Sequence, residues 1–351
     1  MKLIELHILQ SFPVSCLNRD DVGSPKSAIF GGVQRARISS QCLKRASRLL
    51  AHQNHARFEG IRSRHLHKPF NEALETAGID TENAAKYAEE LCKLFSKPDS
   101  KHPEQVTTAV YLSPGEIQQI AQVIASAIVA DEGTKEVTKN AKNAIKNATR
   151  TDAADIALFG RMIANDPNLN VEGAGMFSHA LSTHKTNNEV DFFSAVDDRK
   201  GDAEDAGAGM IGSLEFNSAT YYRYIAINLD LLEAPTHLGG LSENERKDIL
   251  RAFIKAALTA VPNARKNSMN AATLPHEVLG IRKNKGQPLQ LINAFEDPVS
   301  SKGKGFAAAS VDEMVKHLES IEKVWEKQGE KQILTQTEGG FDAFVDALIK
   351  D

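Results

Sequence analysis

Residues 16–48 read CLNRDDVGSPKSAIFGGVQRARISSQCLKRASR and say more about the fold and function than any other segment. They hold seven basic side chains and two acidic ones, a local charge of +5 (seven minus two). Gly31–Gly32 lead through alternating arginines to Ser39–Ser40, where a helix should begin because serines cap helix N-termini. Free N–H groups and the helix dipole at such a start attract anions. The pattern predicts a site for a phosphate backbone. The alternative is a solvated basic face beside a turn.

Composition sets the wider limits. The chain has 351 residues, of which 41% are apolar, enough for one large domain or two ordinary ones. A net charge of −4 argues against a simple nucleic-acid-binding tail but allows a local basic groove. The three cysteines form no CxxC pair and predict reduced thiols. With no signal peptide and no long apolar run, we expect a cytoplasmic protein without membrane association.

The order of patterns predicts an α+β fold. Apolar β-branched sequence predicts strands, and alanine-rich or capped sequence predicts helices. The segments, in order, are a strand at 3–11, a helix after Ser40, helical sequence at 56–180, a loop at 186–220, a strand at 221–232, and helices from Ser242 to about 260 and from Ser310 to about 328. A strand–helix frame with a helical insertion and a long loop suits a split ferredoxin-like fold.

Five segments resemble the CasC family, the Cas7-type backbone subunit of type I-E CRISPR Cascade complexes. They are NRDD…AIFGG…R.RISSQ.LKRA near the N-terminus, ADIALFGRM at 154–162, GMFSHALSTH at 175–184, DFFSAVDD at 191–198 and FNSATYYRYIAINL at 216–229. All five occur in the family's order, and together they span about residue 3 to about residue 270. The last eighty residues match less clearly.

The resemblance implies an RNA-recognition-motif (ferredoxin-like) palm formed by residues 1–55 and 180–351. A large helical fingers insertion would occupy 56–179, and a thumb hairpin or loop about 186–220. The implied function is a non-catalytic, guide-RNA-binding backbone subunit that oligomerises along crRNA and kinks it at regular intervals. The target sequence is then recognised by base pairing with the guide, while the protein binds the guide's sugar–phosphate backbone. The implied partners are crRNA, target DNA, further copies of the chain and other Cascade subunits.

The resemblance also implies RNA-backbone contacts from Arg19, Lys26, Ser39, Gln41, Lys44 and Arg48, to which the basic stretch adds Arg35, Arg37 and Arg45. Arginine forks and lysine charges bind phosphate oxygens, and hydroxyl or amide groups add neutral hydrogen bonds. Lys44 and Arg48 are four residues apart and so share one helical face. The alternative is that some of these cations pair with Asp20 or Asp21.

A lysine row forms the second candidate site. Lys135, Lys139, Lys142 and Lys146 fall within roughly 60° on a helical wheel. The opposite face is apolar, with Val137, Ala141, Ala144, Ile145 and Ala148. In the resembling family a lysine row on the fingers is thought to hold duplex DNA, so the row predicts DNA binding. A solvated helix face is the alternative.

The third candidate comprises Met176, Phe192 and Phe193. The resemblance places them among apolar side chains of the thumb region that displace every sixth guide nucleotide. An inserted apolar group can offset the cost of unstacking a base. Adjacent aromatic residues usually turn one ring inward, so we expect one of the two phenylalanines to be core.

Two other functions stay open. Asp20 or Asp21 with a divalent ion could cleave RNA, as in related type III subunits, or the chain could be a generic single-strand RNA binder. Gly207–Gly212 match G-x-G-x-x-G, but an acidic loop precedes them and strand-like sequence follows, so we reject a dinucleotide site. The histidines show no metal-ligand spacing, and we expect neither a metal nor a cofactor.

Overall fold

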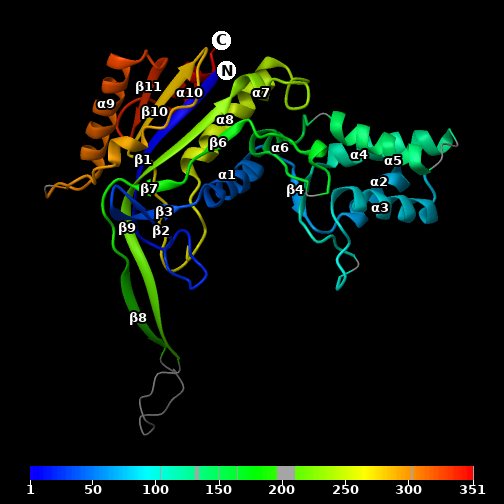
Figure 1. Cartoon of the computed structure of the whole chain (residues 1–351), viewed down its shortest axis with the longest axis horizontal. Coiled ribbons are helices and arrows are strands. Elements are labelled where there is room, and N and C mark those ends of the chain that lie inside the picture. The colour runs from blue at the N-terminus through cyan, green and yellow to red at the C-terminus, as the bar shows by residue number, and fades with distance from the viewer. Residues whose placement is uncertain are drawn as a thin grey trace, which may run out of the picture. The chain divides into compact units, whose positions relative to one another are not determined.

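The computed structural model describes residues 1–102, 104–130, 134–148, 150–163, 165–195, 210–301 and 303–350, with the backbone only at 134 and 135 (Figure 1). The chain forms two compact units. A helical unit contains residues 1–2, 50–176 and 227–253. A sheet unit contains residues 3–49, 177–226 and 254–351.

A large, mainly antiparallel sheet dominates the sheet unit. Its strand order is β11-β10-β1-β9-β7-β3-β2, and both β6 and β8 also pair with β9. The strands are β1 (Leu3–Ser15), β2 (Ser27–Phe30), β3 (Val33–Ile38), β6 (Gly175–Phe177), β7 (Ala180–Ser182), β8 (Glu189–Ala195), β9 (Met210–Asn228), β10 (Glu277–Lys283) and β11 (Glu330–Thr335). The first eight residues of β1 are all buried, as expected for a central strand covered on both faces.

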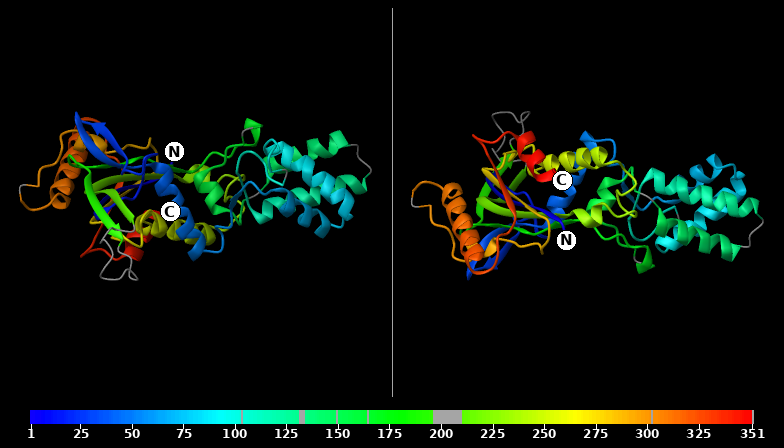
Figure 2. Two further views of the ribbon diagram at one scale, coloured as in Figure 1. Left: turned by 90° about the horizontal axis from the view of Figure 1, so that it is seen from below. Right: turned by 90° about the horizontal axis from the view of Figure 1, so that it is seen from above.

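The sheet unit also contains helices. They are the first part of α1 (Ser40–Asn54), the end of α8 (Glu243–Thr259), α9 (Ala307–Val324) and α10 (Phe341–Ile349), with a short 3-10 turn η2 (Ile292–Phe295). α9 packs on β1, and α10 packs on β10 and β11 (Figure 2). A Cβ at Gly280 would lie 2.8 Å from a Leu348 methyl and 2.9 Å from Phe344, so a glycine here lets α10 approach β10 closely.

A buried polar network ties the loop after β10 to the sheet. The Glu5 carboxylate lies 2.6 Å from Lys283 Nζ and accepts hydrogen bonds from the Tyr224 hydroxyl and the Leu289 N–H. Beside it, His7 Nδ1 lies 2.9 Å from the Tyr222 hydroxyl. Burial, aided by the nearby Lys283 charge, lowers the pKa of His7 to about 3, so this ring is neutral at physiological pH.

The helical unit contains α2 (His67–Thr76), α3 (Thr81–Phe95), α4 (Pro114–Val129), α5 (Thr134–Asn147), α6 (Ala154–Phe159), α7 (Leu229–Leu232), the two-stranded sheet β4 (Ile61–Ser63) and β5 (Val110–Leu112), and the turn η1 (Pro167–Leu169). Helices α2 to α5 share one apolar core. Ser113 and Glu116 form a capping box at α4, and buried Glu116 also binds Arg161 at 2.8 Å and Arg150 at 3.1 Å. No helix among the described ranges is long and apolar enough to cross a membrane.

The expectation of an α+β protein with a helical insertion agrees with this mixed architecture, and several boundaries differ. The helical unit also takes in residues 227–253, which the sequence placed in the palm. The stretch expected as a strand at 221–232 is strand only to Asn228, and α7 begins at Leu229. Ser310 does not start a helix: α9 begins at Ala307, and the Ser310 hydroxyl contacts the Phe306 carbonyl and Thr183 Oγ1.

Candidate nucleic-acid interface

The glycine pair of the basic stretch closes a hairpin. Strands β2 and β3 pair from Ser27↔Ala36 to Phe30↔Val33. Gly31 and Gly32 between them have φ values of 57° and 73°. Two positive φ angles are what a two-residue hairpin turn requires. A Cβ at Gly31 would lie only 1.7 Å from the Glu296 carbonyl oxygen, so this turn presses on the protein's own backbone. The expectation of a phosphate-cradling glycine loop is therefore wrong at Gly31.

Arg35 is also a structural residue. Its side chain is completely buried. The guanidinium donates to four carbonyl oxygens, those of Phe30 (3.2 Å), Ser182 (3.0 Å), Phe295 (2.8 Å) and Glu296 (3.1 Å). These bonds fasten the hairpin to the 295–296 segment and leave no exposed fork for a phosphate. Arg35 must be removed from the expected RNA contacts. Sequence reasoning could not separate it from Arg37, which lies two residues further along β3 and is half-buried.

The predicted start of α1 is confirmed. The Ser39 hydroxyl accepts a hydrogen bond from the Cys42 N–H at 3.3 Å, the bond expected of an N-cap residue. The Ser40 N–H donates to His179 Nδ1 at 3.0 Å. Ser39 itself is 8% exposed. Protein groups therefore use two of the N–H groups that the sequence assigned to an anion, and Ser39 chiefly orders the helix start.

The remaining predicted RNA contacts reach the surface. Arg19, Gln41 and Arg45 are exposed, and Lys26, Arg37, Lys44 and Arg48 are half-buried. Lys44 Nζ lies 5.5 Å from the centre of the Phe177 ring. Partial burial lowers the pKa of Lys44, while the aromatic face attracts its charge. This contact holds the Lys44 stem in place, and no carboxylate in the described part of the chain forms an ion pair with Lys44.

Asp20 organises the loop that carries Arg19. Its Oδ1 accepts hydrogen bonds from the N–H groups of Val22 (3.1 Å) and Ser24 (2.9 Å). The backbones of Arg19 and Pro25 form an isolated antiparallel β-bridge across the loop. The Asp20 carboxylate thus accepts hydrogen bonds from the backbone of its own loop. The sequence had suggested instead that Asp20 pairs with a neighbouring cation, and among the described residues no such ion pair forms. This geometry presents Arg19 at the loop's edge.

The sheet unit has a second basic loop, distant in sequence from the first. Asn263, Arg265, Lys266, Asn267 and Ser268 line a hollow of about 540 Å³. Arg265 has a φ of 52°, unusual for a residue other than glycine. Burial raises the pKa of the Cys16 thiol, and the charges of Arg265 and Arg19 oppose that rise. Sequence analysis missed this loop, although its adjacent Arg-Lys pair among asparagines was a visible signal.

The thumb expectation corresponds to the β8–β9 hairpin, which extends beyond the rest of the sheet (Figure 1). Its strands pair from Glu189↔Phe216 to Ala195↔Met210. The connecting residues, including Gly207–Gly209 of the G-x-G-x-x-G match, lie outside the described part of the chain.

Neither phenylalanine of the hairpin is core. Phe192 is 69% exposed. Phe193 is half-buried over Gly212, where an added Cβ would lie 2.6 Å from its ring. The expectation that one ring would be core is wrong, because a two-stranded ribbon has no second layer to receive it. Residues directly opposite each other in the two strands lie on the same face of the hairpin. Phe192 is therefore on the same face as Val190 and Ile211, which are both exposed. Met176, in β6, is half-buried.

The lysine helix has the predicted two faces. Val137, Ala141, Ile145 and Ala148 are buried, and Lys139, Lys142 and Lys146 are exposed. Lys139 lies 2.8 Å from Glu136, and Lys142 lies 3.2 Å from Asp166. The second ion pair was not visible in the sequence, because Asp166 is distant along the chain. The side chain of Lys135 lies outside the described residues. DNA binding by this row stays a prediction.

Three comparisons with known proteins bear on this surface. A family model described as "CT1975-like protein" matches residues 4–348. No curated protein matches the sequence. A solved structure titled "CRISPR RNA-guided surveillance complex, pre-nicking" contains a chain that is 28% identical, with 99% of each chain covered and a TM-score of 0.76. A chain of a second "CRISPR RNA-guided surveillance complex" is 24% identical, covers 99% of this chain and 98% of its own, and has a TM-score of 0.61, which supports the fold alone.

Proposed function

Because this chain belongs to the CT1975-like protein family and is a Cas7-type backbone subunit of Cascade, we propose that it binds the backbone of crRNA without cleaving it. Several copies would polymerise along one guide, in a complex of type I-E. The sheet unit would act as the RNA-recognition-motif palm. The guide's bases would remain free to pair with target DNA.

The observation that carries this proposal is the set of basic side chains in the stretch that reach the surface. Arg19 projects from a loop whose aspartate serves the backbone, and Lys44 rests on an aromatic ring instead of an acid. Arg48 follows Lys44 by one helical turn on α1, so both can meet neighbouring phosphates. We add Arg265 and Lys266 to the proposed contacts, since both are cations that line a hollow of the same sheet unit. Neutral and cationic donors without base-reading pairs suit backbone binding.

The β8–β9 hairpin supports the proposal of a kinked guide. Its exposed Phe192, Val190 and Ile211 share one face of the hairpin. A two-stranded hairpin is marginal alone in water and gains stability when an apolar face is covered. We propose that this face displaces guide bases, with Phe192 as the wedge.

A metal-dependent RNA-cleaving subunit remains the second candidate function. It would depend on Asp20 or Asp21, but the Asp20 carboxylate already accepts two backbone hydrogen bonds. Replacing Asp20 by alanine should therefore loosen the Arg19 loop and weaken RNA binding. Loss of RNA cleavage with unchanged binding would favour the enzyme instead.

The test is to purify the chain from cells that express a CRISPR array, then size and sequence the RNA that accompanies it. A Lys44→Ala/Arg48→Ala variant is compared with wild type and with Lys323→Ala, a charge-matched control at the last turn of α9. We expect guide-sized RNA with wild type and control and its loss in the double variant. Each lost phosphate contact should also flatten the log–log salt dependence by roughly 0.7. RNA of mixed length, or none, with wild type would refute the proposal.

A further inference from the structure

The second basic loop, residues 263–268, follows α8 and precedes β10. Both of its flanks pack on one apolar cluster, in which Ala271 is 3% exposed and against which Val261 lies partly buried. The same cluster contains Leu17, from the basic stretch, and Leu43, from the first turn of α1. The loop is therefore anchored in the same interior as elements that carry other proposed RNA contacts.

A buried pair, Gln10 on β1 and Arg223 on β9, holds both flanks of this loop. Gln10 is completely buried and Arg223 is 1% exposed. Arg223 donates one hydrogen bond to the Gln10 side-chain oxygen and one, at 2.5 Å, to the Ala257 carbonyl in the last turn of α8. Gln10 Nε2 in turn donates to the Thr273 carbonyl at 2.7 Å. The pair thus binds the chain just before the loop and just after it.

The chemistry of each flank suits the group that holds it. The Ala257 carbonyl is one of the last four of α8, which lack a partner within the helix, and a cation is favoured at a helix C-terminus. Burial lowers the pKa of Arg223 to about 10, so the guanidinium stays charged at physiological pH. The Thr273 hydroxyl also donates to the Ser11 carbonyl, at 2.9 Å. Both flanks are therefore fixed by hydrogen bonds to the sheet.

The loop itself has a backbone that needs such support. Arg265 has a φ of 52°, and a residue other than glycine keeps this conformation only where the surrounding structure holds it. The Met269 N–H donates to the Arg265 carbonyl at 2.8 Å, and the Lys266 N–H donates to the Asn263 carbonyl at 3.2 Å. These short-range bonds shape the loop, and the two flanks set its direction.

We infer that Gln10, oriented by Arg223, is a positioning residue that holds this loop in place for the RNA backbone, with Arg265 and Lys266 as the groups that contact phosphate. The inference rests on the proposed RNA-binding function. A basic side chain whose loop is already ordered loses less freedom when it meets a phosphate. Gln10 contributes to RNA affinity only through the loop and does not touch the RNA.

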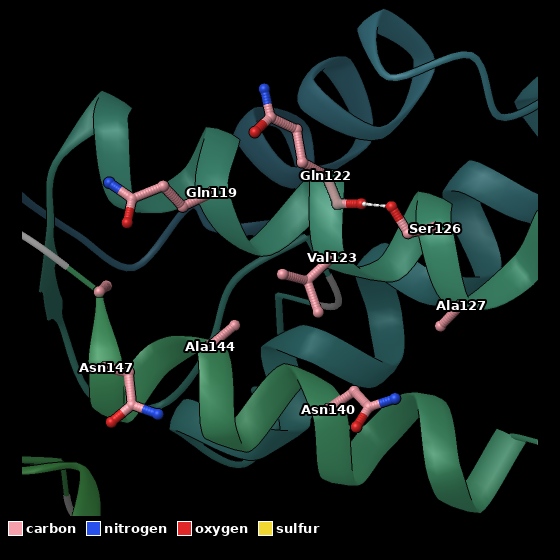
Figure 3. A pocket seen from close by; sticks show the side chains of 9 residues that line it. Gln119, Gln122, Val123, Ser126, Ala127, Asn140, Ala144 and Asn147 are labelled. Carbon is pink, nitrogen blue, oxygen red and sulfur yellow. Dashed lines mark hydrogen bonds between the residues drawn. The ribbon is translucent and has the colours of Figure 1, made fainter.

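Gln10→Glu separates this role from the fold. Glutamate keeps an oxygen for Arg223 and removes the donor to Thr273, so only the returning flank is released. Thr273→Val is a milder second variant, which removes the hydroxyl bond to Ser11. Gln122→Glu is the matched control: it makes the same change of charge on α4 of the helical unit, at a side chain that lines the hollow between α4 and α5 (Figure 3).

Hydrogen exchange of residues 261–272 is measured without RNA, and binding of the full chain to a labelled guide RNA is measured over a range of salt concentrations. Gln10→Glu and Thr273→Val should both speed exchange in this segment. Gln10→Glu should also lower the association constant roughly two- to tenfold. In an Arg265→Ala/Lys266→Ala background, whose salt slope should be flatter by roughly 0.7 for each lost contact, Gln10→Glu should cause no further loss, because the contacts that it positions are gone.

Unchanged exchange of residues 261–272 in both variants would overturn the inference, because the loop would then be held without these bonds. An equal loss of RNA affinity with and without the two loop cations would overturn it too, since Gln10 would then act elsewhere. So would an equal loss in Gln122→Glu, which would trace the effect to net charge. A wild-type chain that binds no RNA would instead refute the proposed function, and faster exchange in Gln10→Glu would still show that Gln10 anchors the loop.

Discussion

At the scale of single residues, burial separates basic side chains that look equivalent in sequence. Arg35 and Lys44 both belong to the stretch that resembles an RNA-binding segment. Arg35 is completely buried among carbonyl oxygens, whereas Lys44 reaches the surface beside Phe177. A buried guanidinium is retained for the donors it supplies, because removing them leaves carbonyls without partners.

Arg35→Met should therefore lower the free energy of unfolding by about 3 kcal/mol or more, since several carbonyls lose their donors at once. Lys26→Met, a matched change at a half-buried position, should cost under about 0.5 kcal/mol. Urea denaturation of both variants measures this difference. Equal stability of the two would show that the Arg35 contacts contribute little.

His7 predicts a pH dependence of stability. Its pKa is lowered to about 3 in the folded chain, against the ordinary value of 6.5. Between these values the unfolded chain binds more protons, so stability is complete above about pH 6.5 and falls as the pH drops toward 3. The loss from this residue approaches about 1.4 kcal/mol per pH unit well below pH 6.5.

The measurement is the free energy of unfolding of wild type and His7→Phe at several pH values between 4 and 7. The variant should be less stable at pH 7, because the Tyr222 hydroxyl loses its hydrogen bond with His7 and keeps the one from the Leu291 N–H. It should also show a flatter pH profile. Parallel profiles for the two proteins would contradict the assignment.

At the scale of elements, the glycine pair of the β2–β3 hairpin forms a turn, whereas the sequence pattern had suggested a phosphate-binding loop. Two consecutive glycines with alternating arginines suggested a phosphate loop. The structure uses them for a tight turn whose first glycine touches Glu296. The turn thereby docks the hairpin on the segment that also binds Arg35.

Gly31→Ala and Gly32→Ala form a matched test of that docking. Both residues have positive φ, so each alanine costs about 1 kcal/mol through backbone strain. Only Gly31 faces an obstacle, the Glu296 oxygen at 1.7 Å, whereas nothing lies within 4 Å of a Cβ at Gly32. Thermal melts should show a clearly larger loss for Gly31→Ala. Equal losses of stability in the two variants would mean that the Glu296 backbone moves away from the added methyl group at little cost in free energy.

At the scale of the whole molecule, one chain combines a sheet unit and a helical unit, each with its own interior. The proposed RNA contacts belong to the sheet unit and the proposed DNA contacts to the helical unit. Head-to-tail copies that do not close into a ring form an open filament. Under the proposed function, the guide RNA limits the length of that filament.

Lengthening the guide by twelve nucleotides should accordingly add two copies of the chain, if each copy occupies the six-nucleotide interval implied by the CasC resemblance. Native mass spectrometry of complexes with the two guides counts the copies. Phe192→Ser should weaken this fixed spacing, while Ser194→Ala, a change on the same face of β8, should not. A constant copy number with both guides would exclude a guide-limited filament.

The sequence by itself determined the α+β class, the helical insertion, the starts of α1 and α4, and the two faces of α5. These depend on local periodicity and capping, which neighbouring residues specify. Tertiary structure alone decided that Arg35 is buried, that Gly31 touches Glu296 and that Lys142 pairs with Asp166. Each of these contacts joins residues far apart in the chain. Local pattern therefore indicates which cations are available, and only packing decides which of them remain exposed to bind a phosphate.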